Sequence, residues 1–137
     1  MYNEAEYEAF EKRMEAEYPK MFSEPYGGFA IGAGWWLIIE RLCDSIQHYI
    51  DWQNKNHEKH PVVEQVVVRQ IKEKFGGLRF YYDGGDDEIS GMVRMAESWA
   101  AASCETCGDR GQRRSGGWIR TLCDKHEAEL QARKNNE

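Results

Sequence analysis

Four side chains near the end of the sequence have the types and the spacing of a metal-binding set. Cys104 and Cys107 form a CxxC pair, and after fifteen intervening residues Cys123 and His126 form a CxxH pair. Each pair places two ligands within one tight turn, so four side chains can surround one ion at roughly 2.0–2.3 Å. Three thiolates and one imidazole are an established ligand set for Zn²⁺. The spacing therefore predicts a zinc site.

The number of ligands favours a structural ion. Four protein ligands fill a tetrahedral shell, whereas a catalytic zinc site keeps one position for water. A thioredoxin-like redox pair is the competing interpretation of Cys104 and Cys107, but that pair follows a strand, and here an amphipathic helix is expected before it. Cys43 lies alone in an apolar helical run and is expected to be a small buried hydrophobe. This use of cysteine fits a reducing cytosol.

The composition is that of one folded domain with an acidic net charge. The chain has 137 residues, 41% of them hydrophobic, and a formal net charge of −6. No apolar run reaches the roughly 18 residues of a membrane span, and the first residues lack the basic and apolar segments of a signal peptide. We therefore expect a cytoplasmic protein that makes no membrane contact.

The charge is spread unevenly along the chain. Residues 1–60 carry a net charge of −5, residues 61–103 carry −2, and residues 104–137 carry +1. Neutralisation of phosphates supplies most nucleic-acid affinity, so an acidic chain is a poor general binder of DNA. Only the C-terminal segment can offer a local basic face, through Arg110, Arg113, Arg114 and Arg120.

The first half of the chain predicts two helices separated by a loop. Tyr7, Phe10 and Met14 recur at helical spacing, which indicates a helix over residues 3–18 with a buried stripe and an acidic solvent side. The glycine-rich residues 26–34 predict an extended loop.

Residues 35–53 have a wide apolar face and predict the central helix of the core. Trp36 and Trp52 fall outside that face. Each is therefore either a packing residue under a loop or an exposed anchor for a partner.

The second half begins with a predicted β-hairpin over residues 62–83. Its first strand is rich in β-branched residues, Phe75-Gly76-Gly77 supplies the turn, and the second strand places Tyr81 on the face opposite Phe80. Asp86 and Asp87 can cap a third helix, about residues 87–102, that packs on one face of the hairpin.

The third helix runs directly into Cys104, so no flexible linker is expected before the zinc ligands. A knuckle at Cys104–Gly108, a short hairpin with its tip near Gly116, and a helix that opens at Cys123 follow in the order of a treble clef. We therefore predict an α+β fold. Helices pack on a β-hairpin or small antiparallel sheet over residues 1–103, and a treble-clef-like zinc module is fused to it over residues 104–137.

Three stretches carry a resemblance to a known family. They are Gly34-Trp-Trp-Leu, Gln70-Ile-Lys-Glu-Lys-Phe-Gly-Gly-Leu-Arg-Phe-Tyr-Tyr82, and Gly116-Gly-Trp-Ile-Arg-Thr-Leu-Cys-Asp-Lys-His126 with its upstream CxxC. On these motifs, which cover most of residues 30–130, the chain resembles a family of small, largely uncharacterised proteins of tailed phages, prophages and bacterial genomes. The resemblance implies a mobile-element origin, hence the host cytoplasm, and a structural zinc. It implies no activity for any residue.

Three classes of function fit these features. The first is a non-enzymatic interaction protein that modulates or inhibits a host protein, with Trp36, Trp52, Tyr81 and Trp118 as candidate contacts, because tryptophan and tyrosine dominate binding energy at interfaces. The alternative without a binding role is that most of these side chains belong to the hydrophobic core.

The second class is a nucleic-acid binder that uses residues 108–134. Its phosphate contacts would be Arg110, Arg113, Arg114 and Arg120, and Trp118 would stack on a base.

The third class is an enzyme. A treble-clef nuclease needs a histidine on the module's hairpin, and residues 108–122 contain none. The acidic cluster at Asp83, Asp86, Asp87 and Glu88 has the ligand types for Mg²⁺, but its position between a turn and a helix start favours a helix cap. We therefore expect no catalytic activity. The sequence does not choose an oligomeric state.

Overall fold

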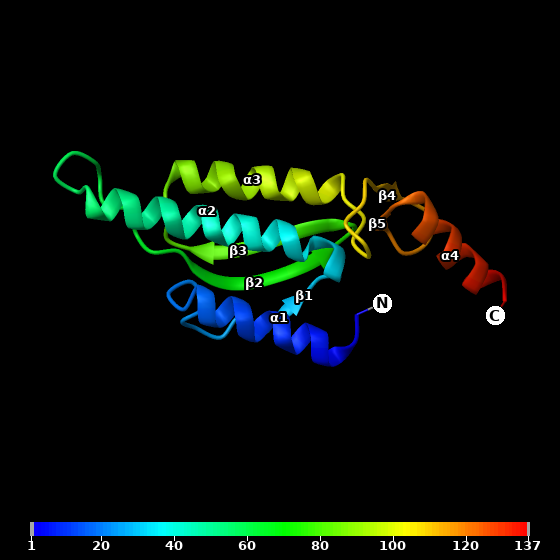
Figure 1. Cartoon of the computed structure of the whole chain (residues 1–137). Coiled ribbons are helices and arrows are strands. Elements are labelled where there is room, and N and C mark those ends of the chain that lie inside the picture. Colours follow the sequence, from blue (N-terminus) through cyan, green and yellow to red (C-terminus); the bar gives the residue numbers. More distant parts are fainter. Residues whose placement is uncertain (1, 137) are drawn as a thin grey trace.

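The predicted α+β class is confirmed by the computed structural model, which describes residues 2–136 (Figure 1). The helices are α1 (Glu4–Glu17), the 3₁₀ helix η1 (Ala33–Trp35), α2 (Trp36–Lys55), α3 (Asp87–Ala101) and α4 (Asp124–Asn135). The strands are β1 (Phe29–Ala30), β2 (Val67–Lys74), β3 (Gly77–Asp83), β4 (Gln112–Arg114) and β5 (Arg120–Leu122).

The larger sheet contains the predicted hairpin and one strand that was not predicted. β2 and β3 pair antiparallel, and β1 adds parallel to the other edge of β2, with Phe29 beside Ile71. We predicted only an extended loop at residues 26–34. A two-residue strand is too short to show a periodicity, and its partner strand is distant in the sequence. No local sequence pattern could therefore predict it.

The hairpin turn consists of two residues, Phe75 and Gly76, closed by the pair of Lys74 and Gly77. Both turn residues have positive φ, 53° and 79°, as a mirror-image two-residue turn requires. The Glu73 carboxylate accepts the Gly76 N–H at 2.6 Å and so supports this turn.

The first strand of the hairpin begins later than predicted. It starts at Val67 rather than at residue 62. Asn54, near the end of α2, holds the preceding segment through two hydrogen bonds to the backbone of Val63, at 2.8 and 3.1 Å. These bonds satisfy the Val63 backbone, which therefore needs no strand partner.

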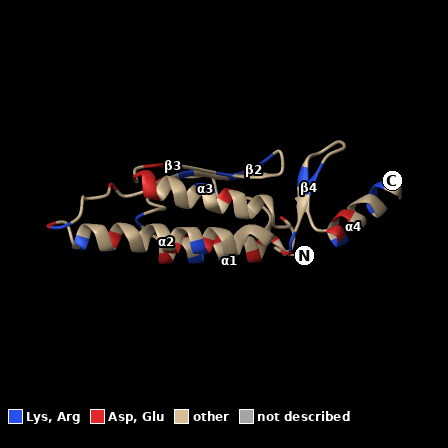
Figure 2. Cartoon of the chain, turned by 90° about the horizontal axis from the view of Figure 1, so that it is seen from above, with Lys and Arg blue, Asp and Glu red and all other residues tan. Residues whose placement is uncertain are grey.

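In the part of the chain that the structure describes, helices cover one face of this sheet and leave the other open. α2 and α3 run antiparallel across it and α1 lies beside α2, as the view along the sheet makes plain (Figure 2). Ile71, Leu78 and Phe80 point toward the helices and are buried. The residues that precede and follow each of them along its strand point to the opposite, solvent-facing side of the sheet. The core therefore lies between the sheet and the three helices.

Helix α1 is fixed at its start and along one side. Asn3 accepts the Glu6 N–H at 3.0 Å, while the Glu6 carboxylate accepts the Asn3 N–H at 2.8 Å, which forms a capping box. Phe10 stacks on Trp36 with ring centres 4.5 Å apart and also contacts Phe29. Trp36 is thus half-buried beneath α1, so it is a packing residue under a helix rather than under the loop that we considered.

The acidic residues before α3 are engaged in structural contacts. Asp86 accepts the Ile89 N–H at 3.1 Å as the helix cap, and it accepts the Tyr49 hydroxyl at 2.6 Å. The hydrogen bond to this carboxylate raises the pKa of Tyr49 to about 12. Asp83 pairs with Arg69 at 2.6 Å. These contacts favour the predicted cap over a magnesium site.

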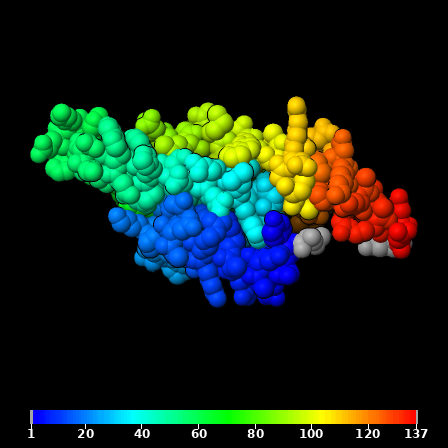
Figure 3. Space-filling model, in the orientation of Figure 1, coloured from blue at the N-terminus to red at the C-terminus, as the bar shows by residue number. Residues whose placement is uncertain are grey.

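The molecule is elongated, with residues 104–136 at one end (Figure 3). Across the part of the chain that the structure describes, every helix is too short or too polar to cross a lipid bilayer.

Candidate metal centre

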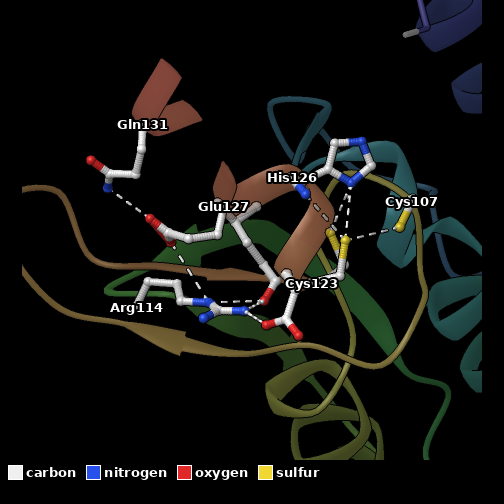
Figure 4. A network of polar contacts seen from close by, with 9 residues as sticks. Cys107, Arg114, Cys123, His126, Glu127 and Gln131 are labelled. Atoms are coloured by element: carbon white, nitrogen blue, oxygen red, sulfur yellow. Dashed lines mark hydrogen bonds and ion pairs between the residues drawn. The ribbon is translucent and has the colours of Figure 1, made fainter. Parts of the chain in front are cut away.

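The four predicted ligands converge at the start of α4. Figure 4 shows Cys107, Cys123 and His126 of this group. Their ligand atoms all lie within 4.8 Å of one another. Cys107 Sγ is 3.8 Å from Cys123 Sγ, and His126 Nδ1 is 3.6 Å from Cys104 Sγ and 3.2 Å from Cys123 Sγ. Cys104 and Cys123 are buried, His126 is half-buried, and Cys107 is exposed.

Two of these distances are close to those around a tetrahedral ion. With metal–sulfur bonds near 2.3 Å and a metal–nitrogen bond near 2.0 Å, two sulfurs stand about 3.8 Å apart, and a sulfur and a nitrogen about 3.5 Å apart. The Cys107–Cys123 and Cys104–His126 separations match these edges. The Cys123–His126 separation of 3.2 Å and the longest separation within the set, up to 4.8 Å, differ from these edges, so small side-chain shifts bring the Cys₃His group around one metal ion.

Local backbone structure explains why the ligands meet. Cys123 is the N-cap of α4, and its Sγ accepts the N–H of His126, which places both ligands in the first helical turn. The other pair lies on a tight turn in which the Gly108 N–H donates to the Cys104 carbonyl at 2.8 Å. Gly108 has a φ of 85°, a conformation that favours glycine, so the residue after the CxxC pair allows this turn.

The surroundings favour the thiolate form of Cys104 but oppose that of Cys107, whose pKa partial burial and the neighbouring cysteines raise to about 12. Burial raises the pKa of Cys104, but backbone N–H groups of Cys123, Cys107 and Thr106 outweigh it and lower that pKa to about 7. The Glu129 carboxylate lies 3.8 Å from His126 Nε2, the nitrogen that faces away from the cysteines. A carboxylate that hydrogen-bonds this nitrogen orients a metal-binding imidazole, and at 3.8 Å Glu129 is near enough to do so after a small side-chain shift.

Arg114 belongs to a network that closes the module (Figure 4). Its guanidinium donates to the Leu122 carbonyl at 3.1 and 3.2 Å and pairs with Asp124 at 2.8 Å. It also lies 3.6 Å from Glu127, which in turn accepts a hydrogen bond from Gln131. Arg114 thus joins β4 to α4, and its donors are used inside the molecule.

Backbone contacts attach the metal-binding turn to the core. The Gly34 N–H donates to the Glu105 carbonyl at 2.8 Å, and Trp35 Nε1 donates to the Ser103 carbonyl at 2.9 Å. A Cβ at Gly34 would lie 2.2 Å from the Cys104 carbonyl oxygen, so only glycine allows this approach. The CxxC turn therefore packs directly on the Gly34-Trp-Trp motif.

Two further contacts come from residues that sequence reasoning missed. The Thr121 hydroxyl donates to the Gly76 carbonyl at 2.6 Å, so the hairpin turn of the core touches β5. The Glu105 carboxylate accepts the Gly32 N–H at 2.9 Å, and burial raises its pKa. The sequence shows only a glutamate between two cysteine ligands, and its burial and its contact with Gly32 depend on tertiary packing, so neither contact had a clear sequence signal.

The other predicted arginines do not share one face. Arg113 pairs with Thr121 and Arg114 pairs with Arg120 across the hairpin. Since neighbouring residues of a strand point to opposite faces, Arg113 lies on the side of Thr121 and Arg120 on the other. Arg120 lines a cavity of about 490 Å³ beside the metal ligands, together with Lys125 and Arg133. These cations can offset the negative charge of three thiolates on a divalent ion.

The remaining predicted contacts are exposed but scattered. Trp118, 75% exposed, lies between β4 and β5, and Arg110 is exposed at the start of the same module. Trp52 is 48% exposed near the end of α2 and packs on His60, while Tyr81 is 44% exposed on β3. The structure does not bring these side chains into one site.

No protein-family model, curated protein or solved structure matches this chain.

Proposed function

We propose that this chain is a non-enzymatic, zinc-containing interaction protein that binds and modulates a host protein. The observation that carries the proposal is an apolar groove of about 350 Å³ between α2 and α3. Its lining from α3 is Gly91, Met92, Met95, Ala96 and Trp99, and its lining from α2 is Ile38, Arg41, Leu42 and Ser45.

The groove is apolar and open to solvent. Met95 at its rim is 69% exposed, and Trp99 is also exposed. Large exposed apolar side chains gathered in one place mark interaction sites in soluble proteins. Gly91 adds to the opening, because a Cβ there would meet nothing within 4 Å.

The shape of the groove suits an amphipathic helix of the partner. It follows α3 from Gly91 to Trp99, about 12 Å or two helical turns at 1.5 Å per residue. An amphipathic helix presents apolar side chains every three or four residues, at the spacing of the apolar residues along α3. Methionine side chains adapt their shape to such a partner. A third helix laid between α2 and α3 would bury Met95 and Trp99.

The structural contacts of the acidic cluster support a role without catalysis. Asp86 is engaged by the α3 cap and Tyr49, and Asp83 by Arg69. The resemblance to phage and prophage proteins supports a mobile-element origin and a partner in the host cytoplasm.

Zinc is the proposed ion because the ligand set is rich in thiolates and has four protein ligands. Elemental analysis of the purified protein should find one zinc per chain. Cys107→Ser should lower that content, whereas Cys43→Ala, which changes a buried cysteine far from the site, should keep it. An unchanged zinc content in Cys107→Ser, or iron in place of zinc, would contradict the proposal.

The groove is tested by a matched pair of substitutions. Met95→Glu places a charge in the groove, and Val62→Glu places the same charge at another exposed apolar position, 70% exposed, outside it. A host protein that co-purifies with the wild type should be lost with Met95→Glu and kept with Val62→Glu. A photo-crosslinker at position 95 should attach to a helical segment of that protein.

Three outcomes would count against this function. The Glu variants could behave alike, or the crosslink could fall on a non-helical segment. Alternatively, sedimentation could reveal a dimer of this chain that only Met95→Glu dissociates, which would assign the groove to a second copy instead.

Nucleic-acid binding through residues 108–134, the alternative from the sequence, has less support. Arg114 is used inside the module, and Arg113 and Arg120 lie on opposite faces of its hairpin.

A further inference from the structure

The solvent face of the β2–β3 hairpin is the most distinctive surface that neither the metal centre nor the groove uses. Side chains alternate along each strand, so those next to the buried Ile71, Leu78 and Phe80 point outward. The outward set is Gln70, Lys72 and Lys74 from β2 and Arg79 and Tyr81 from β3. Among residues 2–136, the helices all lie on the other side of the sheet (Figure 2).

Two like charges stand directly opposite each other on it. Lys72 pairs with Arg79 across the two strands. Like charges in such a pair destabilise a sheet unless an anion lies between them. Within residues 2–136, the ion pairs include neither of these two side chains. The uncompensated pair is therefore a local cost, of the kind that proteins retain at binding sites.

The lysine next to this pair also has no carboxylate partner in the part of the chain that the structure describes and can bind an anion. Lys74 lies 5.6 Å from the centre of the Phe75 ring and has no carboxylate partner among the described residues. Glu73, the nearest acid in sequence, is turned toward the turn, where it accepts the Gly76 N–H. Only Arg69, at the far end of the face, is neutralised, by Asp83 at 2.6 Å. Lys72, Lys74 and Arg79 thus form a cationic cluster.

An aromatic ring and an amide lie in the next row. Tyr81 is 44% exposed and pairs directly with Gln70. Rows on one face of a strand are about 7 Å apart, so a base stacked on Tyr81 would leave its phosphates within reach of the lysine and arginine side chains. Gln70 is placed to hydrogen-bond the edge of such a base.

The charge distribution of the whole molecule points the same way. Residues 4–17 contain six glutamates and two basic residues, and this helix lies on the side away from the open face (Figure 2). On a chain with an acidic net charge, a local cluster of three cations, unpaired within the described residues, attracts and orients an anionic partner to the face that carries it. The net charge of −6 therefore does not describe this surface.

We propose that the open face of β2 and β3 binds single-stranded nucleic acid. Lys72, Lys74 and Arg79 contact phosphates, and Tyr81 stacks on a base. A single strand is favoured over a duplex because only unpaired bases offer their faces to an aromatic side chain. This site is separate from the α2–α3 groove, on another face and for another class of partner.

The test measures fluorescence anisotropy of labelled single-stranded DNA and RNA oligonucleotides, with duplexes of the same sequence for comparison. Lys72→Ala/Arg79→Ala should weaken single-strand binding at least tenfold. It should also reduce the slope of log affinity against log salt by about 1.4, since each phosphate contact on a single strand contributes about 0.7.

The matched control is Arg110→Ala/Arg113→Ala, which removes the same two charges from the C-terminal module and should bind within about twofold of the wild type. Tyr81→Ala should weaken binding about fivefold or more, and Tyr81→Phe should restore it, because the stacking ring is kept. Circular dichroism and zinc content of each variant establish that it is folded.

Several results would overturn the proposal. Among them are no binding of single strands by the wild type, tighter binding of duplexes, or a loss confined to the module variant. Equal competition by polyglutamate together with no effect of Tyr81→Ala would assign the face to anions in general. Met95→Glu should leave oligonucleotide binding unchanged, so failure of the groove and failure of this face are distinguishable.

Discussion

Thr121 ties the metal-binding module to the core through one buried hydrogen bond, 2.6 Å from its hydroxyl to the Gly76 carbonyl. Thr121→Val keeps the shape of the side chain and removes the donor, so the carbonyl is left unpaired. We expect the free energy of unfolding to fall by about 1–3 kcal/mol, measured by urea denaturation. Thr106→Val, at the other threonine of the module, should change it by less than about 0.5 kcal/mol. Equal stability of the two variants would contradict the role of Thr121.

Tyr49 gives a prediction about how the stability of the fold depends on pH. Its hydrogen bond to Asp86 raises its pKa from 10.0 to about 12, so the folded state holds this proton more tightly than the unfolded state. The resulting stabilisation is complete below pH 10 and is lost as the pH rises toward 12. The stability advantage of the wild type over Tyr49→Phe should therefore be constant from about pH 7 to 9 and shrink above pH 10. A constant difference throughout this range would contradict the assignment.

Single residues differ in how far the sequence could predict them. The ligands Cys104, Cys107, Cys123 and His126 were predicted because a CxxC or CxxH pair fixes its own local geometry, and the structure brings them together. Arg114 was grouped with the other arginines as a contact. Its role depends on the Leu122 carbonyl and Asp124, whose positions follow from the hairpin register. The types of residue present do not determine the strand register of that hairpin.

At the scale of elements, the close approach of Gly34 to the CxxC turn can be tested by a pair of alanines. Gly34→Ala places a Cβ 2.2 Å from the Cys104 carbonyl oxygen and should destabilise the protein by about 1–3 kcal/mol. Gly91→Ala lies in open space on α3 and should stabilise it by about 0.5–1 kcal/mol. Thermal unfolding measures both. A stable Gly34→Ala variant would show that the core and the turn are not in contact.

The elements with strong local patterns were predicted well. The three core helices, the hairpin turn and the helix after Cys123 each have a periodicity, a cap or a turn sequence that acts over a few residues. The parallel strand β1 and the late start of β2 depend on contacts between distant segments, such as Asn54 with Val63. The same holds for the α2–α3 groove, because its residues come from two helices whose crossing no single periodicity describes.

The whole molecule is asymmetric in a way that the net charge hides. Its acidic helix α1 and its apolar groove lie on the side of the helices (Figure 2), whereas Lys72, Lys74 and Arg79 lie on the open face of the sheet. Charge counted along the chain assigned +1 to residues 104–137 and −2 to residues 61–103, which directed attention to the C-terminal module. Strand alternation instead collects Lys72, Lys74 and Arg79 on one surface of the more acidic segment.

We propose centrally that one zinc ion, bound by Cys104, Cys107, Cys123 and His126, joins the start of α4 to the CxxC turn that packs on the core. X-ray absorption spectroscopy at the zinc edge of the purified protein tests it most directly. The account predicts three sulfurs at about 2.3 Å and one nitrogen at about 2.0 Å from the metal. A shell of oxygen and nitrogen only, or a protein that contains no zinc, would contradict it.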